Sequence, residues 1–158
     1  LYTALRTVRP DIRIILTVSP VRHIKDTLAL NSVSKAILRV ASHQLSQRFA
    51  GVDYFPAFEL MIDDLRDYRF YKNDMLHPTE AAEEYIYKKF LTCYTSEATQ
   101  VFIKQWSEIR SALSHKAFHL SSQGHQQFLR SLHKKISALK GKINVEQELK
   151  EVEKQLIS

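Results

Sequence analysis

Two short apolar segments separated by one long helical segment constrain the fold of this chain more than any other feature. Residues 12–18 and 52–55 are short and rich in β-branched, aromatic and other apolar residues, which is typical of strands in a covered parallel sheet. Residues 31–49 have apolar positions at helical spacing. Two strands joined by such a helix pair in parallel through a right-handed crossover. The sequence therefore predicts an α/β fold with a partial parallel sheet and flanking helices.

The predicted helix over residues 31–49 has one apolar side, as expected of a helix that packs against a core. This side consists of Val33, Ile37, Val40, Ala41 and Leu45. Asn31 or Ser32 is expected to cap the start of the helix, and Gly51 to stop the chain from continuing it. A further helix is expected over residues 58–68.

The chain changes character near Thr95. Beyond this point there is no strand signal, and three sets of apolar residues have helical spacing. The sets are Phe102, Trp106, Ile109 and Leu113; Phe128, Leu132, Ile136 and Leu139; and Val145, Leu149, Val152 and Leu156. We therefore expect one domain over residues 1–95, the α/β part, and a second over residues 96–158, an all-helical extension that forms a helical hairpin or a short coiled coil.

The net positive charge of the chain comes mainly from the second predicted domain. Residues 1–95 include 13 basic and 11 acidic residues, whereas residues 96–158 include 10 basic and 6 acidic residues. Seven basic residues and no acidic one lie between positions 110 and 142: Arg110, Lys116, Arg130, Lys134, Lys135, Lys140 and Lys142. No DNA- or RNA-binding signature accompanies them, so we expect a solvated helical face and no specific nucleic-acid partner. No apolar run approaches the roughly 20 residues of a membrane helix, so no membrane partner is expected.

Cysteine and histidine usage argues against a metal site. Cys93 is the only cysteine, which excludes an intramolecular disulfide and a cysteine-based zinc site and suits a reducing, cytoplasmic compartment. We expect Cys93 to be a small buried filler. His115 and His119 have the spacing of two ligands on one helix face, with Gln123 and His125 nearby, but their charged neighbours are basic. No metal is predicted.

The stretch with most chemical information is an acid and a histidine three residues apart, Asp74 and His77, just before a helix that Pro78 opens. A nucleophilic hydrolase uses such a pair: the histidine takes a proton from a serine and returns it to the leaving group, and the carboxylate holds its other nitrogen. The spacing alone is weak, and an exposed surface pair is the alternative. The loop follows the last strand-and-helix unit, which places it at the edge where α/β sheets bind ligands.

Ser19 and His23 are the other candidate site residues, because they follow the first predicted strand directly. Ser19 is expected to line a pocket and not to be the nucleophile, since Pro20 removes the backbone N–H that helps to bind an oxyanion. His23 could line the same pocket and contact substrate, or be a loop histidine that bonds to backbone. Arg22 and Glu59 are charged residues near strand ends, for which structural ion pairs are the alternative.

Five blocks of this sequence, in this order, resemble the GSCFA family, which is related to the SGNH hydrolases. They are residues 16–23, Asn31 with Ser34 and Lys35, residues 54–59, residues 67–71 and residues 74–78. The resemblance covers residues 3–90 and implies an SGNH-type sheet, with Asp74 and His77 as two members of a Ser-His-Asp triad. It implies no cofactor.

The sequence departs from the family at the motif that gives it its name. Gly-Ser-Cys-Phe-Ala, which carries the expected nucleophile, is absent, and none of the three glycines is followed by serine. The first residue is Leu1 and not methionine. We therefore expect a catalytically incomplete fragment, with one flank of its sheet exposed or covered by a partner.

Two functions follow from these observations. The first is an ester hydrolase or acyltransferase of the SGNH type that acts on a small ester or an acylated carbohydrate. The alternative is a non-catalytic interaction module, in which the C-terminal helices bind a helical partner or a second copy of the chain.

Overall fold

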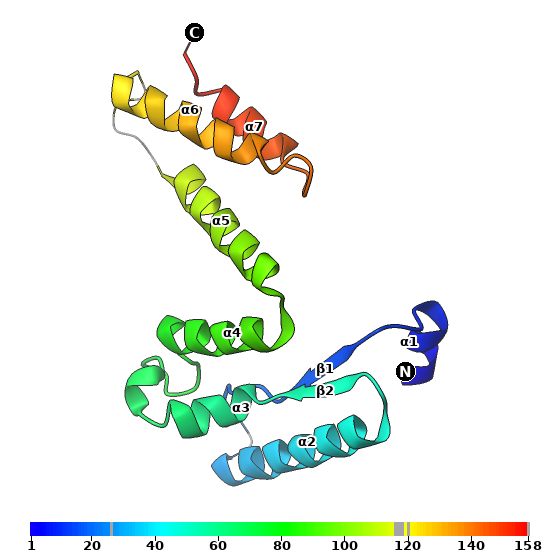
Figure 1. The fold of residues 1–158 in the computed structure, drawn as a ribbon. Coiled ribbons are helices and arrows are strands. Elements are labelled where there is room, and N and C mark those ends of the chain that lie inside the picture. Colours follow the sequence, from blue (N-terminus) through cyan, green and yellow to red (C-terminus); the bar gives the residue numbers. More distant parts are fainter. Residues whose placement is uncertain (26, 116–118, 120, 158) are drawn as a thin grey trace. The chain divides into compact units, whose positions relative to one another are not determined.

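The computed structural model describes residues 1–25, 27–115, 119 and 121–157, and the chain divides into two compact units, Leu1–Tyr94 and Thr95–Ser158. We call them the α/β unit and the helical unit. The α/β unit contains α1 (Tyr2–Val8), β1 (Ile14–Thr17), α2 (Leu28–Arg48), β2 (Val52–Phe55), α3 (Ala57–Glu59), the π-helix η1 (Leu60–Asp64), the 3₁₀-helix η2 (Tyr68–Phe70) and α4 (Glu80–Tyr94) (Figure 1). The helical unit contains α5 (Glu97–Ser114), α6 (Gln123–Ser137) and α7 (Glu146–Glu153).

The two strands pair in parallel, from Ile14 opposite Val52 to Thr17 opposite Phe55. This confirms the predicted mixed α/β fold. The first strand is shorter than the predicted residues 12–18 at both ends. At its start, Ile12 is held in a turn, where its N–H donates to the carbonyl of Arg9 at 3.1 Å. At its end, the partner strand is followed by Pro56, which has no N–H to continue the ladder.

Helices cover both faces of this small sheet. The Tyr54 side chain lies under the guanidinium of Arg39 on α2, 4.2 Å from the ring centre. The next residue, Phe55, packs edge-on against Phe90 of α4, with ring centres 5.2 Å apart. Because successive strand residues point to opposite faces, α2 and α4 lie on opposite sides of the strands.

The apolar side of α2 does not pack on the sheet, so that prediction is wrong. Val33, Ile37, Val40 and Leu45 are 53%, 62%, 56% and 41% exposed, and Ala41 is exposed as well. The side that packs is polar: Lys35 is buried and Arg39 is half-buried. Polar side chains that face the protein need hydrogen-bond partners, and both of these have one. Polar contacts therefore decide which side of α2 faces the sheet.

The ends of α2 also differ in part from expectation. The helix begins before Asn31, because the hydroxyl oxygen of Thr27 accepts a hydrogen bond from the N–H of Leu30 at 3.1 Å and caps the first turn. It ends at Arg48, and Gly51 then takes a left-handed conformation, with φ of 78°. The helix has already ended at that point, because its C-cap residue Phe49 is extended, with φ of −119° and ψ of 121°, so Gly51 is not the residue that stops it.

The segment after β2 is less regular than the single helix predicted over residues 58–68. It is the short α3 followed by a π-helical turn, in which the N–H of Leu65 bonds to the carbonyl of Leu60 at 3.0 Å. Met61 and Leu65 are buried by this turn with Tyr71 and Ala82, and these four residues form a small core. Met61 and Leu65 are four residues apart, a spacing that places both side chains on the same side of the turn.

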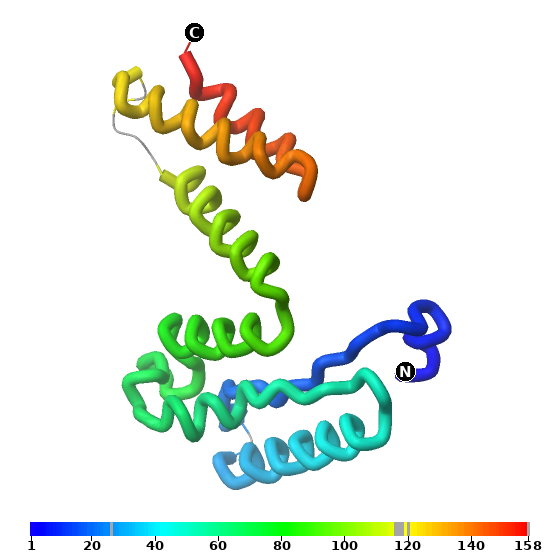
Figure 2. Tube along the Cα trace, viewed as in Figure 1, coloured from blue at the N-terminus to red at the C-terminus, as the bar shows by residue number. Residues whose placement is uncertain are grey.

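The helical unit has one continuous apolar core. Its buried members are Ile109, Leu129, Leu132, Ile136, Leu139, Val145, Leu149 and Val152. Gln126, near the start of α6, accepts a hydrogen bond from the N–H of Ile157 at 2.9 Å and donates to the carbonyl of Gln155 at 3.1 Å. The start of α6 therefore lies beside the end of α7, and the two helices form an antiparallel hairpin (Figure 2).

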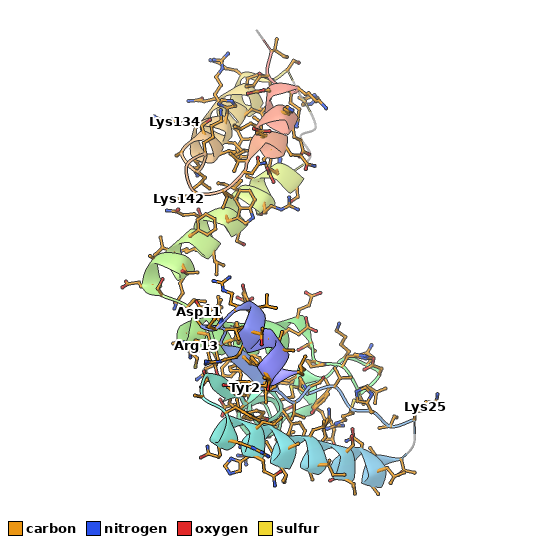
Figure 3. All side chains as sticks on the ribbon, turned by 90° about the vertical axis from the view of Figure 1, so that its right-hand side faces the viewer. Tyr2, Asp11, Arg13, Lys25, Lys134 and Lys142 are labelled. Carbon is orange, nitrogen blue, oxygen red and sulfur yellow. The ribbon has the colours of Figure 1, made fainter. Side chains whose placement is uncertain are left out.

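The basic residues of this unit lie on its surface. Arg110, Arg130, Lys134, Lys135, Lys140 and Lys142 are exposed, and Lys134 and Lys142 are labelled in Figure 3. Lys116 lies outside the described residues. Of the helices in the described part of the chain, none is both long enough and apolar enough to cross a membrane.

Candidate active site

The acid and the histidine lie on a tight bend between η2 and α4. Tyr71 and Pro78 form an antiparallel bridge, and the N–H of Lys72 donates to the carbonyl of His77 at 2.8 Å. The chain reverses between them through Met75, whose φ of 61° is left-handed. Such a conformation is uncommon for a residue other than glycine, so the contacts around Met75 must stabilise it.

The carboxylate of Asp74 holds the bend from the inside. One of its oxygens, Oδ1, accepts hydrogen bonds from the N–H groups of Leu76 at 2.8 Å and His77 at 3.0 Å. The other, Oδ2, lies 2.7 Å from Nδ1 of the His77 imidazole. The backbone bonds from His77 and Leu76, with the imidazole contact added, hold the pKa of Asp74 well below its usual range. The carboxylate therefore stays ionised at neutral pH.

This arrangement leaves one imidazole nitrogen available. A carboxylate accepts hydrogen bonds only, so Nδ1 of His77 bears the proton between them. Within the described part of the chain, no group bonds to Nε2 of His77, and the side chain is 53% exposed. Neutral His77 is therefore a proton acceptor at Nε2 that faces solvent, with its tautomer set by Asp74.

The bend lies at the carboxyl edge of the parallel strands. The N–H of Arg22, shortly after β1, donates to the carbonyl of Leu76 at 3.2 Å. Pro78, next to His77, lines a groove of about 440 Å³ together with Thr17 and Phe55, the last residues of β1 and β2. Asp74 and His77 themselves are not among the residues that line this groove. The contact with Arg22 and the place of Pro78 put the bend next to the strand ends, the edge that the position of the loop in the sequence predicts.

The structure places Ser19 and His23 in the segment beside the bend, in roles that involve the backbone. The Ser19 hydroxyl oxygen accepts a hydrogen bond from the N–H of Val21 at 3.2 Å. The backbone N–H of His23 donates to the side-chain carbonyl of Asn31 at 2.9 Å, and His23 is exposed. In the described part of the chain, neither side chain contacts His77. Their roles in binding substrate stay predictions.

A polar layer between α2 and the sheet supports the segments that lead to the site. The ammonium group of Lys35 donates to the carbonyl of Ser19, and burial lowers the pKa of this lysine. Glu59 accepts from Arg39 at 2.8 Å and from the Tyr54 hydroxyl at 2.8 Å. Burial, followed by the hydrogen bond and charge of Glu59, raises the pKa of Tyr54 well above its usual value. Glu59 thus has the structural ion pair that we considered as its alternative role.

Arg22 is the supporting residue that sequence reasoning undervalued. It makes no ion pair in the described part of the chain, and its guanidinium lies 4.1 Å from the ring centre of Tyr71 and donates to the carbonyl of Met75 at 3.3 Å. The signal in the sequence was its position between Ser19 and His23 with no acidic residue adjacent.

No group of three or more histidine, cysteine, aspartate or glutamate residues is placed to hold a metal in residues 1–25, 27–115, 119 and 121–157. His115 and His119, whose spacing suggested a metal site, do not lie on one helix, because α5 ends at Ser114 and His115 is its C-cap residue. Cys93 is exposed on α4, so the expectation that it is a buried filler is wrong.

The fold and the site together define an α/β protein with an acid–histidine pair at the carboxyl edge of its parallel strands. The chain belongs to the GSCFA family: the profile of the GSCFA family matches residues 1–90, and that of the GSCFA domain protein, C-terminal domain, matches residues 106–158. This confirms the family that the sequence blocks predicted. Comparison with curated proteins gave no match, and comparison with solved structures gave none either.

Proposed function

We propose that this protein is the base-bearing part of an SGNH-type ester hydrolase or acyltransferase, in which His77 is the general base and acid and Asp74 orients it. The observation that carries the proposal is the 2.7 Å contact between Nδ1 of His77 and a carboxylate that two backbone N–H groups already hold. A carboxylate fixed in this way aligns the imidazole without losing its own charge. The exposed Nε2 is then the atom that exchanges protons with a nucleophile.

Each half of the reaction has two proton transfers at His77. A serine hydroxyl attacks the ester carbonyl, its proton passes to Nε2, and the tetrahedral intermediate expels the alcohol, which takes that proton from Nε2. Water or an acceptor hydroxyl then attacks the acyl-enzyme with the same assistance from His77. The family resemblance assigns the nucleophile to the serine of Gly-Ser-Cys-Phe-Ala, a motif that these 158 residues do not contain.

The substrate class that we propose is a small ester such as an acylated carbohydrate. The proposed chemistry needs no cofactor, because acid–base and nucleophilic groups of the polypeptide perform each step. Cys93 is the only cysteine, which suits a reducing compartment, and we therefore place the reaction in the cytoplasm.

The test is cleavage of p-nitrophenyl acetate by the complete gene product. His77→Ala should lower kcat/KM about 10³-fold, since it removes the proton acceptor. His43→Ala is the matched control, because His43 is an exposed histidine of α2. Undiminished turnover by His77→Ala would refute the proposed function. Equal losses in both variants would point to a general effect on folding and count against it as well.

The second candidate function is protein interaction through the helical unit, and a groove between α5 and α6 favours it. The groove has a volume of about 360 Å³ and an apolar floor that includes Ile109 and Leu132, with Glu108 and Lys135 at its rim. Phe128 lines it and is 38% exposed. An amphipathic helix of a partner or of a second copy suits such a groove. Sedimentation analysis of the chain and of Phe128→Ser tests this: association that Phe128→Ser weakens supports it, and a strictly monomeric wild type refutes self-association.

A further inference from the structure

The bend that carries the acid–histidine pair is held from two sides. Asp74 holds it from the inside, through the N–H groups of Leu76 and His77. Arg22 holds it from the outside: its backbone N–H reaches the carbonyl of Leu76 at 3.2 Å, and its guanidinium donates to the carbonyl of Met75 at 3.3 Å. Two of the three peptide units between Asp74 and His77 therefore take part in these contacts, and the N–H of Met75, in the third, donates to the carbonyl of Lys72 at 2.8 Å.

The guanidinium of Arg22 is itself fixed in place. It stacks over Tyr71 at 4.1 Å from the ring centre and lies 5.9 Å from that of Tyr68. A planar guanidinium can stack flat on an aromatic face while its edge donates hydrogen bonds, whereas an ammonium group has no planar face to stack. Tyr68 is the first residue of η2 and Tyr71 directly follows η2, on the N-terminal side of the bend. One side chain thus links the end of β1, η2 and the bend.

The contact with Met75 falls where the bend needs support most. Met75 is the one non-glycine residue with positive φ among the described residues. A residue in that conformation returns to an ordinary one unless its neighbours hold it, and such a change would turn the N–H groups of Leu76 and His77 away from Asp74. Arg22 accordingly acts on His77 through the backbone of the bend.

We propose that Arg22 is a positioning residue, which holds the Asp74–His77 pair at the carboxyl edge of β1 by fixing the Met75 bend. The effect of Arg22 on catalysis rests on the proposed function, whereas its effect on the conformation of the bend rests on the contacts above. Arg22 touches neither side chain of the pair, so it does not take part in proton transfer.

The structural consequence is measurable in this chain by NMR. In Arg22→Gln, the amide hydrogens of Leu76 and His77 should lose protection from exchange, and the pKa of the Asp74 carboxyl should rise toward the ordinary value of about 3.9, because the backbone donors no longer converge on it. Arg69→Gln is the matched control, since Arg69 also stacks on a ring, that of Phe70, at 4.9 Å. Unchanged exchange and titration in Arg22→Gln would overturn the proposal.

Arg22→Lys separates geometry from charge. The lysine keeps the positive charge but loses the stacked, planar donor, so it should resemble Arg22→Gln in amide protection. Full protection in Arg22→Lys would show that charge alone stabilises the bend, and that outcome contradicts a role based on the guanidinium geometry.

The catalytic consequence is a split between kcat and KM in the complete gene product. Arg22→Gln should lower kcat roughly 10- to 100-fold with little change in KM, as expected when the base is misplaced and substrate contacts remain. Full kcat in Arg22→Gln alongside an inactive His77→Ala would overturn the positioning role alone. Undiminished turnover in His77→Ala identifies instead a failure of the proposed function.

Discussion

The helical unit and the α/β unit bury their apolar residues in different ways. In the helical unit, eight apolar residues join in one buried cluster. The described residues of the α/β unit also include eight buried apolar ones, but only four of them join in one cluster, and apolar residues of α2 such as Ile37 and Val40 are more than half exposed. The buried side of α2 has instead Lys35, whose ammonium group is paired with a backbone carbonyl.

The difference shows that the two units depend on different interactions. The helical unit is stabilised by burial of apolar surface, which is non-directional and roughly proportional to area. The α/β unit adds to its apolar burial hydrogen bonds with fixed geometry between α2, the strand ends and the bend of residues 74–77. Directional contacts position side chains for chemistry, and those of the α/β unit support the segments that form the candidate active site.

The largest expected effect comes from a matched pair of isoleucines. Ile136→Ala should destabilise the helical unit by about 2–5 kcal/mol, because Ile136 is fully buried in its cluster. Ile37→Ala in α2 should change stability by less than about 0.5 kcal/mol, because Ile37 is 62% exposed. Urea unfolding followed by circular dichroism and by the fluorescence of Trp106, which packs against the cluster, measures both. Equal losses would mean that the apolar side of α2 is buried in solution.

The polar layer of the α/β unit should show the next largest effect. Glu59→Ala removes the acceptor of Arg39 and Tyr54 and should cost about 1–3 kcal/mol, since hydrogen bonds to charged groups are involved. The loss should appear in the far-ultraviolet transition and leave the Trp106 transition unchanged. Asp11→Ala is the control, because the pair of Asp11 with Arg9 is highly exposed. If Glu59→Ala lowered the free energy of unfolding by less than Asp11→Ala does, the polar layer would not stabilise the α/β unit.

A pair of glycines compares the backbones of the two units. Gly51→Ala should destabilise the α/β unit by about 1–2 kcal/mol, because its φ of 78° is unfavourable for any residue with a Cβ. Gly141→Ala in the helical unit should be neutral or stabilise by up to about 1 kcal/mol, since a Cβ there meets no atom within 4 Å. Chemical denaturation of both variants tests the contrast, and a stabilising Gly51→Ala would contradict the assigned conformation.

The smallest effect is a pH dependence confined to the α/β unit. The pKa of Asp74 is lower in the folded protein than in the unfolded chain. Its ionised carboxylate therefore contributes fully to the stability of the fold above the unfolded pKa of about 3.9, and this contribution is lost as pH falls through the folded pKa. Asp74→Asn should therefore be less stable than wild type at neutral pH and approach it in strong acid. Denaturation of both proteins from pH 7 downward measures this. A stability difference that does not narrow toward low pH would contradict the assigned contacts.

Local patterns in the sequence were enough for the order of the elements and for the family. The parallel pair of Ile14–Thr17 and Val52–Phe55 follows from two apolar segments joined by a helix, because a crossover of that length permits only parallel pairing in practice. The ordered blocks from residues 16–23 to residues 74–78 indicated the GSCFA family, which the profile over residues 1–90 shows. The three-residue spacing of Asp74 and His77 identified the pair but not its geometry.

The sequence by itself determined the order of the main helices and strands and where an acid and a histidine come close along the chain, because these depend on short-range periodicity and turn chemistry. Only the tertiary structure decided which side of α2 faces the sheet, and that Arg22 reaches the bend at Met75. Both depend on partners far away in the sequence: Lys35 bonds to Ser19 and Arg39 to Glu59. A hydrogen bond between residues so far apart leaves no periodic pattern in the sequence, so local patterns cannot predict it.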